Sequence, residues 1–241
     1  MSSIGIILAR GSSKRLPRKN VRPLLGTPLI GWMIGAALAS RLDRVIVSTE
    51  DEEIAEISRR HGADVQFRRP DELAADYASS ESILKHALET VAAAEGKRYD
   101  VCVTLQPTTP FVAPEDIDGC LAALAKRPDL NGCFTVRAVK EPPSWMFIEG
   151  ADGIASLYES GTISGEREHS QLVRQCLIPT GAAYAERTEA LYAQSRVIVD
   201  PTAVHRMSAE RSVDVDDPLD WVIAEAVGRH FGFQPFTRSA R

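Results

Sequence analysis

The chain has 241 residues, a hydrophobic fraction of 44%, a charged fraction of 25% and a formal net charge of -5. These values predict a globular protein with a single large domain. The acidic balance excludes a broad nucleic-acid surface, which needs a basic footprint, so we expect no nucleic-acid partner. The longest apolar stretches have only the length of a strand, and no signal-like segment opens the chain. We therefore expect no membrane partner and no secretory leader.

The cysteines of the chain, Cys102, Cys120, Cys133 and Cys176, are far apart, with no CxxC pair and no histidine at ligand spacing. This pattern argues against a zinc site or a disulfide framework. Buried thiols of this kind persist in a reducing compartment, so we predict a cytoplasmic location.

Short β-rich runs alternate with helical segments over the first half of the chain. In chain order we predict strand 4–8, helix 27–40, strand 44–48, helix 51–62, strand 64–67, helix 79–96, strand 100–105, helix 114–126 and strand 132–136. Thr27 is expected to cap its helix, with Pro28 in the first turn. The alternation is typical of βαβ units and predicts an α/β fold: a mainly parallel sheet with helices on both faces.

The rhythm is lost between residues 137 and 180, where glycines, prolines and scattered aromatics show no helical period. We interpret 137–180 as a small, irregular, β-rich lobe inserted into the single domain 1–241. Regular elements then return as predicted strands 181–185, 196–200 and 212–216. A last helix is expected to begin after Asp217, its N-cap, with Pro218 next.

A basic cluster follows the first predicted strand, in the segment "LARGSSKRLPRKN". Ligands of parallel α/β sheets bind beyond the carboxyl ends of the strands, so this cluster is expected in the binding crevice. A Gly-Ser-Ser turn can present backbone N–H groups to an anion among cationic side chains, which suits a triphosphate. The P-loop and dinucleotide fingerprints are both missing. The alternative is a solvated basic loop.

Two carboxylates stand two residues apart in "SVDVD", at Asp214 and Asp216. On a strand both side chains would leave the same face and repel each other. A cation between them would relieve the repulsion, and Mg²⁺ suits carboxylate and phosphate oxygens. The alternative is that Asp216 faces water and only Asp217 has a role, as a helix cap.

Five blocks carry a family resemblance. They are "LARGSSKRLPRKN" (8–20), "RRPDELAADYASSESILKHALE" (68–89), "TLQPTTPF" (104–111), "LIPTGAAY" (177–184) and "RSVDVDDPLD" (211–220). In this order they resemble the signature blocks of the acylneuraminate cytidylyltransferases, which make CMP-sialic acid and related CMP-nonulosonates. The resemblance implies a Rossmann-like nucleotidyltransferase fold, with the lobe at 137–180 serving dimerisation.

The resemblance also implies the site residues. CTP binding is assigned to Arg10, Ser13, Lys14, Lys19, Asn20, Arg69, Ala78, Ser79 and Ser80. The metal ligands for Mg²⁺ are Asp214 and Asp216, and the sugar-binding residues are Gln106, Gln171 and Tyr184. The residues with the most direct catalytic part are Arg10, Lys14, Lys19 and Asp216. Alternatives remain from the residues alone: Arg69 as a surface arginine, and Ser79 and Ser80 as plain helix caps.

The implied reaction is transfer of CMP from CTP to the anomeric hydroxyl of a nonulosonic acid, with pyrophosphate released. The implied partners are CTP, the acid sugar and a second copy of the chain. The sugar side departs from the neuraminate pattern: Ser170 and Gln171 stand where an Arg-Gln pair is usual, and Thr180 replaces a common asparagine. The alternatives are a cytidylyltransferase for another 3-deoxy-2-keto acid such as Kdo, or a catalytically silent nucleotide-binding homologue.

Overall fold

A six-stranded sheet forms the centre of the computed structural model, which describes residues 1–141, 143–158 and 175–236. In spatial order its strands are β10 (Thr202–Arg206), β6 (Gly132–Ala138), β9 (Leu177–Arg187), β5 (Val101–Leu105), β1 (Ser3–Leu8) and β4 (Arg44–Ser48). Strand β1 runs parallel to β4 and β5, and β10 runs parallel to β6. Only β9 is antiparallel to its neighbours within this sheet. The predicted mainly parallel α/β fold is confirmed.

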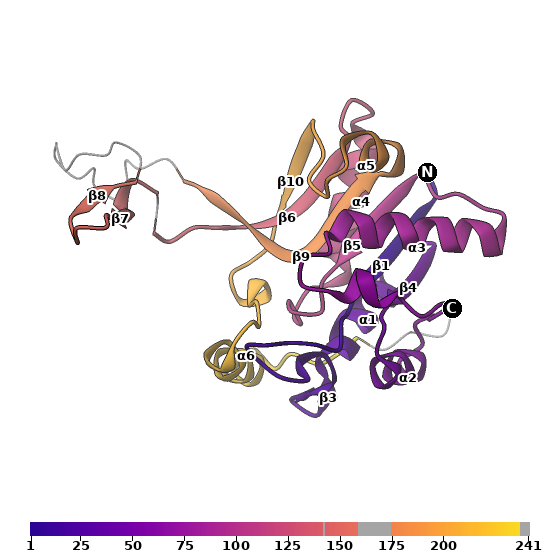
Figure 1. The fold of residues 1–241 in the computed structure, drawn as a ribbon, viewed down its shortest axis with the longest axis horizontal. Helices are drawn as coiled ribbons and strands as arrows, with labels where there is room; N and C mark the ends of the chain where they lie inside the picture. Colours follow the sequence, from indigo (N-terminus) through magenta and orange to yellow (C-terminus); the bar gives the residue numbers. More distant parts are fainter. Residues whose placement is uncertain (142, 159–174, 237–241) are drawn as a thin grey trace.

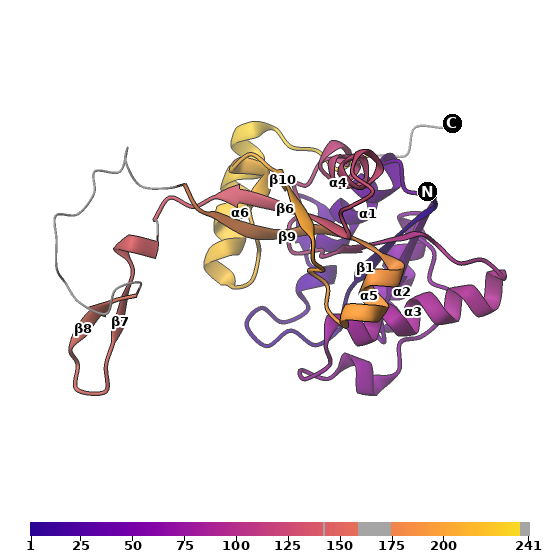
Figure 2. The same ribbon diagram turned by 90° about the horizontal axis from the view of Figure 1, so that it is seen from above.

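Helices cover both faces of the sheet (Figures 1 and 2). They are α1 (Leu29–Ala39), α2 (Glu52–Arg60), α3 (Ser80–Glu95), α4 (Pro114–Lys126), α5 (Thr188–Gln194) and α6 (Pro218–Phe231). Successive side chains of β1 point to opposite faces, so Ile7 packs with α1, α2 and α4 while Ile4 and Ile6 pack with α3 and α5. Burial on both faces explains why "IGIIL" reads as a continuous apolar run.

An arm projects from one side of the sheet (Figure 1). Its stalk is made by the end of β6 and the start of β9, which pair as far as Ala138 and Leu177. Beyond the stalk lie a short 3₁₀ turn, η3 (Pro143–Trp145), and a hairpin of β7 (Phe147–Glu149) and β8 (Ala155–Leu157). The arm falls within the predicted lobe, whose remaining residues 142 and 159–174 lie outside the described part of the chain.

Three predicted strands are absent from the sheet. Segment 64–67 forms only one bridge, from Asp64 to Ile46. Segments 196–200 and 212–216 form no strand in the described chain. Their alternating valines arise for another reason: Val197 and Val199 pack on the core, and Val213 and Val215 pack with Trp221 of α6. An extended loop that buries every second residue has the period of a strand without a neighbouring ladder.

The start of α1 also differs from the expectation. Thr27 and Pro28 form β3, which pairs with β2 (Pro23–Leu24) in a small hairpin, and Pro28 rather than Thr27 holds the N-cap position. The two turn residues, Leu25 and Gly26, both have positive φ, which matches the twist of a two-residue hairpin. The pairing of β2 with β3 therefore takes up Thr27, and the N-cap predicted at Thr27 is wrong.

The helix boundaries that rest on strong caps agree with the sequence. Asp51, Ser79 and Asp217 cap α2, α3 and α6, each accepting a backbone N–H, and α4 starts at Pro114 as predicted. The sequence analysis did not predict β10 or α5.

No helix in the described ranges combines the length and apolarity that a bilayer crossing requires.

A carboxylic acid lies in the middle of the sheet. Glu186 of β9 is fully buried, accepts a hydrogen bond from Thr104 Oγ1 at 2.9 Å, and has no hydrogen-bond partner at Oε2. Burial, only partly offset by the bond from Thr104, raises the pKa of Glu186 well above its ordinary value. The folded protein therefore keeps a proton on Glu186 at pH values at which the unfolded chain has lost it.

We predict that Glu186→Gln stabilises the protein relative to the native chain increasingly as pH rises from 5 to 8. The native protein loses stability over this range because the unfolded state releases the Glu186 proton and the folded state does not. Glutamine keeps an acceptor for Thr104 and carries no charge. Urea denaturation at several pH values measures the difference. Glu189→Gln, an exposed change on α5, is the control, and a pH-independent difference for Glu186→Gln would contradict the prediction.

Candidate active site

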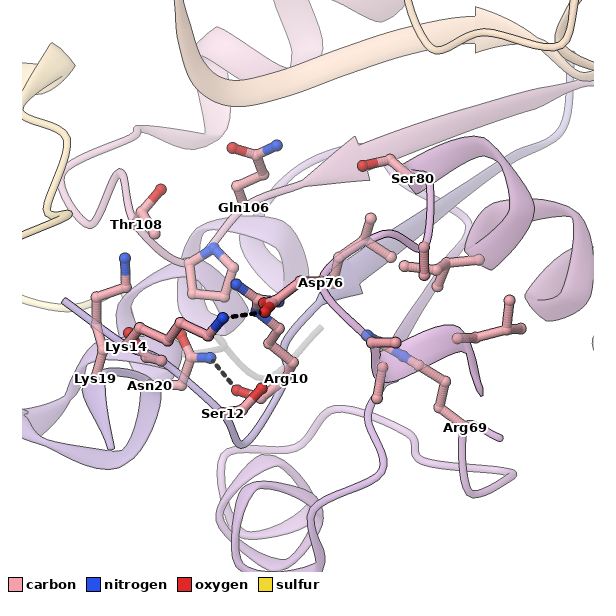
Figure 3. Close-up of a pocket in the computed structure, with 18 of the residues that line it drawn as sticks. Arg10, Ser12, Lys14, Lys19, Asn20, Arg69, Asp76, Ser80, Gln106 and Thr108 are labelled. Atoms are coloured by element: carbon pink, nitrogen blue, oxygen red, sulfur yellow. Dashed lines mark hydrogen bonds and ion pairs between the residues drawn. The ribbon is translucent and has the colours of Figure 1, made fainter. Parts of the chain in front are cut away.

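A pocket of about 500 Å³ opens at the carboxyl ends of β1 and β5 (Figure 3). Its walls come from the loop after β1, from the segment between Arg69 and α3, and from the loop after β5. The switch in crossover direction beside β1 leaves a crevice at this edge, because β4 lies on one side of β1 and β5 on the other. The basic cluster therefore lies where the sequence predicted.

Many of the predicted site residues meet in this pocket. The lining includes Arg10, Ser13, Lys14, Lys19, Asn20, Arg69, Ala78, Ser80, Gln106 and Asp216. Three others are placed elsewhere in the described chain: Ser79, Asp214 and Tyr184 are not part of the lining. Gln171, with the neighbouring Ser170, lies outside the described residues.

Two of the loop cations share one carboxylate. Arg10 Nη1 lies 2.7 Å from Asp76 Oδ1, and Lys14 Nζ lies 2.5 Å from Asp76 Oδ2. Hydrogen bonds from Lys14 and Arg10 lower the pKa of Asp76. Asp76 was not singled out in the sequence, although it belongs to the "ELAADYASS" block.

Two other cations of the cluster, Arg15 and Arg18, point in different directions, and the fifth, Lys19, is buried. Arg15 lies 2.8 Å from Asp216, on the opposite wall. Arg18 turns away from the pocket to Asp51 and Glu53 at the start of α2. The loop is thus not a uniformly solvated basic segment, because every cation in it has a specific acidic partner.

Lys19 is the buried member of the cluster, with 8% of its surface exposed. Its Nζ donates to the backbone oxygen of Val215 at 2.7 Å and to Asp216 Oδ1 at 2.9 Å. A 3₁₀ turn, η1 (Lys19–Val21), directs the side chain inward. The ammonium group joins the first loop to the segment before α6.

Backbone contacts shape the loop after β1. Asn20 Nδ2 donates to the Arg10 oxygen at 2.9 Å, and Gly11 N donates to Glu50 at 2.6 Å. A Cβ at Gly11 would stand 2.4 Å from Asp51 Oδ2, so the close approach requires glycine. The Gly11 N–H predicted to face an anion is thus engaged by the protein's own Glu50, which sequence reasoning missed.

Arg69 is only 2% exposed, so its interpretation as a surface arginine is wrong. Its guanidinium donates to the Ser48 hydroxyl and to the Ser48 backbone oxygen, and lies 4.0 Å from Glu50. Burial lowers the pKa of Arg69 to about 10, with Glu50 opposing the shift and Arg10 adding to it. The group therefore stays charged at neutral pH and can donate hydrogen bonds into the pocket.

Ser79 and Ser80 have different roles. The Ser79 hydroxyl accepts the Ser82 N–H at 3.3 Å as the N-cap of α3, as its capping alternative predicted. Ser80 lines the pocket beside Ala78. The turn that begins α3 therefore carries one structural serine and one that faces the pocket.

The two aspartates do not leave one face of a strand. They lie in the extended segment after η4 (Glu210–Ser212), held by a bond from Val215 N to Thr108 O at 2.8 Å. Burial and the charge of Asp216 raise the pKa of Asp214, against a hydrogen bond from Thr108. Burial opposes ionisation of Asp216, but the hydrogen bond and charge of Lys19, with those of Arg15, lower its pKa overall.

Of the two carboxylates predicted to hold a cation, Asp216 lines the pocket and Asp214 does not. The charges of Asp214 and Asp216 influence each other, as expected for carboxylates near a common position. The described residues contain no group of three or more acidic, histidine or cysteine ligands. Because Mg²⁺ is commonly held by one or two carboxylates together with phosphates and water, these residues would fit the ion only with oxygens that a bound ligand supplies.

The "LIPTGAAY" block lies within β9, whose pairing with β6 is irregular between Phe134 and Val136. Gly181 has φ +81, and a Cβ there would approach Gln106 Oε1 to 3.0 Å. Thr180, which departs from the family asparagine, is buried and bonds to Thr135 Oγ1 at 2.7 Å. Tyr184 stacks on Phe134 with ring centroids 5.9 Å apart. Thr180 therefore joins the irregular part of β9 to β6, while Gln106 lines the pocket.

A family profile described as cytidylyltransferase matches residues 4–211. The chain is 31% identical over 229 residues to N-acylneuraminate cytidylyltransferase A of Danio rerio, covering 95% of this chain and 51% of that protein. It is 28% identical over 234 residues to CMP-N,N'-diacetyllegionaminic acid synthase of Legionella pneumophila, covering 93% and 95%. A pseudaminic acid cytidylyltransferase of Campylobacter jejuni is 42% identical over 113 residues, which is 46% of this chain and 48% of that one. The chain spans about half the length of the Danio rerio relatives.

Solved structures agree on the fold. A CMP:2-keto-3-deoxy-manno-octonic acid synthetase complexed with CTP superposes with a TM-score of 0.70 at 20% identity, covering 96% of this chain and all of that one. A 4-diphosphocytidyl-2C-methyl-D-erythritol synthase from Anaerococcus prevotii gives 0.66 at 14% identity, covering 95% and 96%. The profile match extends over more than half of the sequence and includes most of the residues that form the pocket. The chain belongs to the cytidylyltransferase family.

Proposed function

We propose that the protein transfers CMP from CTP to the anomeric hydroxyl of a nonulosonic acid of the sialic type and releases pyrophosphate. One observation carries the proposal: the cationic loop after β1 and Asp216 near α6 line the same pocket, of about 500 Å³. That volume lies in the range of small-molecule sites. The names of the relatives above state that they act on sialic, legionaminic and pseudaminic acids. These names support the same class of acceptor for this chain.

The chain's own residues would supply positioning and charge. Arg10 and Lys14 reach the pocket from one wall and would bind the phosphate groups. Their positive charges would stabilise the negative charge that develops on the departing pyrophosphate. Arg69, which is charged and buried, would contact the cytosine together with the turn at Ala78 and Ser80. Gln106 would orient the sugar, so that its hydroxyl oxygen attacks the α-phosphorus in line as the bond to the β-phosphate oxygen breaks.

Asp214 and Asp216 would hold Mg²⁺ if the ion is used, with Lys19 and Arg15 setting the position of the Asp216 carboxylate. A bound Mg²⁺ would neutralise phosphate charge and make the attacking hydroxyl more acidic. The thiols Cys102, Cys120 and Cys133 are buried and form no disulfide. They support, as a further proposal, a reducing cytoplasmic location.

The direct test incubates the purified protein with CTP, Mg²⁺ and single acids: N-acetylneuraminate, a legionaminate, a pseudaminate and Kdo. Pyrophosphate release is measured for each. Release with a nine-carbon acid supports the proposal, and release with Kdo alone favours the alternative to which the fold similarity points. CTP binding without release with any acid would identify a silent homologue.

Asp216→Asn is expected to lower kcat by about a hundredfold or more, since a carboxylate that positions metal and phosphate loses its charge. Thermal unfolding should change only modestly, because asparagine keeps an oxygen that can accept the Lys19 hydrogen bond and Lys19 also donates to the Val215 backbone oxygen. Asp217→Asn is the matched control: asparagine caps a helix as well as aspartate, and Asp217 is not in the pocket lining. Equal kcat for Asp216→Asn and the native protein would remove Asp216 from the mechanism.

Gly181→Ala is expected to raise the KM for the acceptor and to lower stability by about 1–2 kcal/mol, because alanine is strained at positive φ and its methyl group crowds Gln106. Gly26→Ala separates the two effects. Gly26 has φ +89, and no atom lies within 4 Å of the position that a Cβ would take there, so it carries the strain without the contact. If both variants change the acceptor KM equally, the contact with Gln106 has no part in acceptor binding.

We also propose a homodimer in which the arm reaches the neighbouring copy's pocket. The arm projects from the body (Figure 2). The exposed apolar side chains on it are Trp145, Met146, Ile148, Ile154 and Tyr158. Several large apolar side chains exposed on one small element are typical of an interaction surface. Light scattering should give twice the mass of the chain, and Ile148→Asp should shift the protein toward monomer. A monomeric native protein at assay concentration would contradict the dimer.

A further inference from the structure

One carboxylate lies among the cations that face the proposed phosphate site. The two oxygens of Asp76 contact Arg10 and Lys14 separately, so a single side chain bridges both cations (Figure 3). Asp76 also lines the pocket, together with the two groups it bridges. A carboxylate held between a guanidinium and an ammonium has the contacts that a phosphate group would make there.

The remaining pocket cations have other acidic partners, and one of them, Arg69, is buried and lies 4.0 Å from Glu50. Arg15 and Lys19 both contact Asp216 on the opposite wall. Lys19 is further anchored by the Val215 oxygen and is buried. Arg10 and Lys14 are therefore the pair that a ligand can recruit by replacing one anion, without disturbing the segment before α6.

Exposure makes this exchange easy. The Asp76 side chain is 51% exposed, and those of Arg10 and Lys14 are 41% and 81% exposed. Ion pairs at such positions are individually weak, because water screens them and long side chains lose freedom on pairing. A triphosphate or pyrophosphate brings several charges to the same two groups and can displace a single carboxylate.

We propose that Asp76 is an internal competitor of the triphosphate: it holds Arg10 and Lys14 in place before the nucleotide binds, and takes both cations back as pyrophosphate leaves. The inference rests on the proposed function and assigns Asp76 the role of a positioning residue. This role differs from simple neutralisation of the two cations. A carboxylate that competes with the ligand weakens polyphosphate binding, whereas one that only positions the cations would strengthen it.

The location of Asp76 links the exchange to the base side of the pocket. Asp76 stands in the turn between η2 (Asp71–Ala74) and α3, and Ala78 N donates to Ala75 O across this turn. Ala75, Ala78 and Asp76 all line the pocket. The exchange of anions at Asp76 would therefore take place on the same turn that carries Ala78.

Calorimetric titration of the full chain with inorganic pyrophosphate tests the proposal. Asp76→Asn should bind pyrophosphate about fivefold to tenfold more tightly than the native protein, since two half-exposed ion pairs no longer compete. In steady state the variant should show a lower KM for CTP together with a lower kcat, because product departs more slowly. Asp76→Glu, which keeps the carboxylate, should restore native values in both measurements.

Asp71→Asn is the matched control. Asp71 lies in the same region and pairs with Arg68 at 2.6 Å, but it is outside the pocket lining, so its loss should change neither affinity nor turnover. Equal or weaker pyrophosphate binding by folded Asp76→Asn, with native binding of CTP and pyrophosphate intact, would overturn this inference alone. Failure of the native protein to bind either ligand would overturn the proposed function as well.

Discussion

The buried ammonium group of Lys19 connects two parts of the chain that are 196 residues apart. It bonds to the backbone oxygen of Val215 and to the Asp216 carboxylate, and it is nearly inaccessible to water. A buried cation without partners would be strongly unfavourable, so these contacts hold the loop after β1 against the segment before α6. The pocket depends on this contact, because Lys19 and Asp216 both line it and neither of their segments belongs to the sheet.

The neighbouring packing keeps the same two segments together. Leu16 and Leu24 from the first loop region, Val215 and Trp221 form one apolar cluster. The loop after β5 adds a backbone bond from Val215 to Thr108. Apolar burial, a charged hydrogen bond and a backbone hydrogen bond thus converge on one short extended segment. The two aspartates are carried on this segment, which explains how irregular backbone can hold side chains in a defined place.

Charge in the pocket is organised as paired opposites rather than as a positive surface. In an acidic chain, the loop cations are matched by Asp76, Asp216, Asp51 and Glu53. The pocket pairs of Arg10, Lys14 and Arg15 are accessible to solvent, whereas Lys19 and Arg69 are buried. A site arranged in this way keeps long cationic side chains ordered, and still allows a more highly charged ligand to exchange for an acid.

Several features could be predicted from residues near one another in sequence. The buried strand "IGIIL", the caps Asp51, Ser79 and Asp217, and the position of the basic cluster after β1 all follow from short-range patterns. The strands wrongly predicted at 196–200 and 212–216 share one cause: burial of every second residue was taken as strand pairing, whereas the valines pack on side-chain clusters. Patterns of burial do not say which neighbour provides the burial.

The sequence by itself determined the α/β class, the edge of the sheet where ligands bind, and the residue types that meet there, because these depend on local periodicity and on the fixed geometry of parallel strands. Only the tertiary structure decided which acid faces which cation: Asp76 between Arg10 and Lys14, Asp216 between Arg15 and Lys19, and Glu50 at Gly11. These pairs join loops that are distant in sequence, and their partners are selected by the packing of the elements between them.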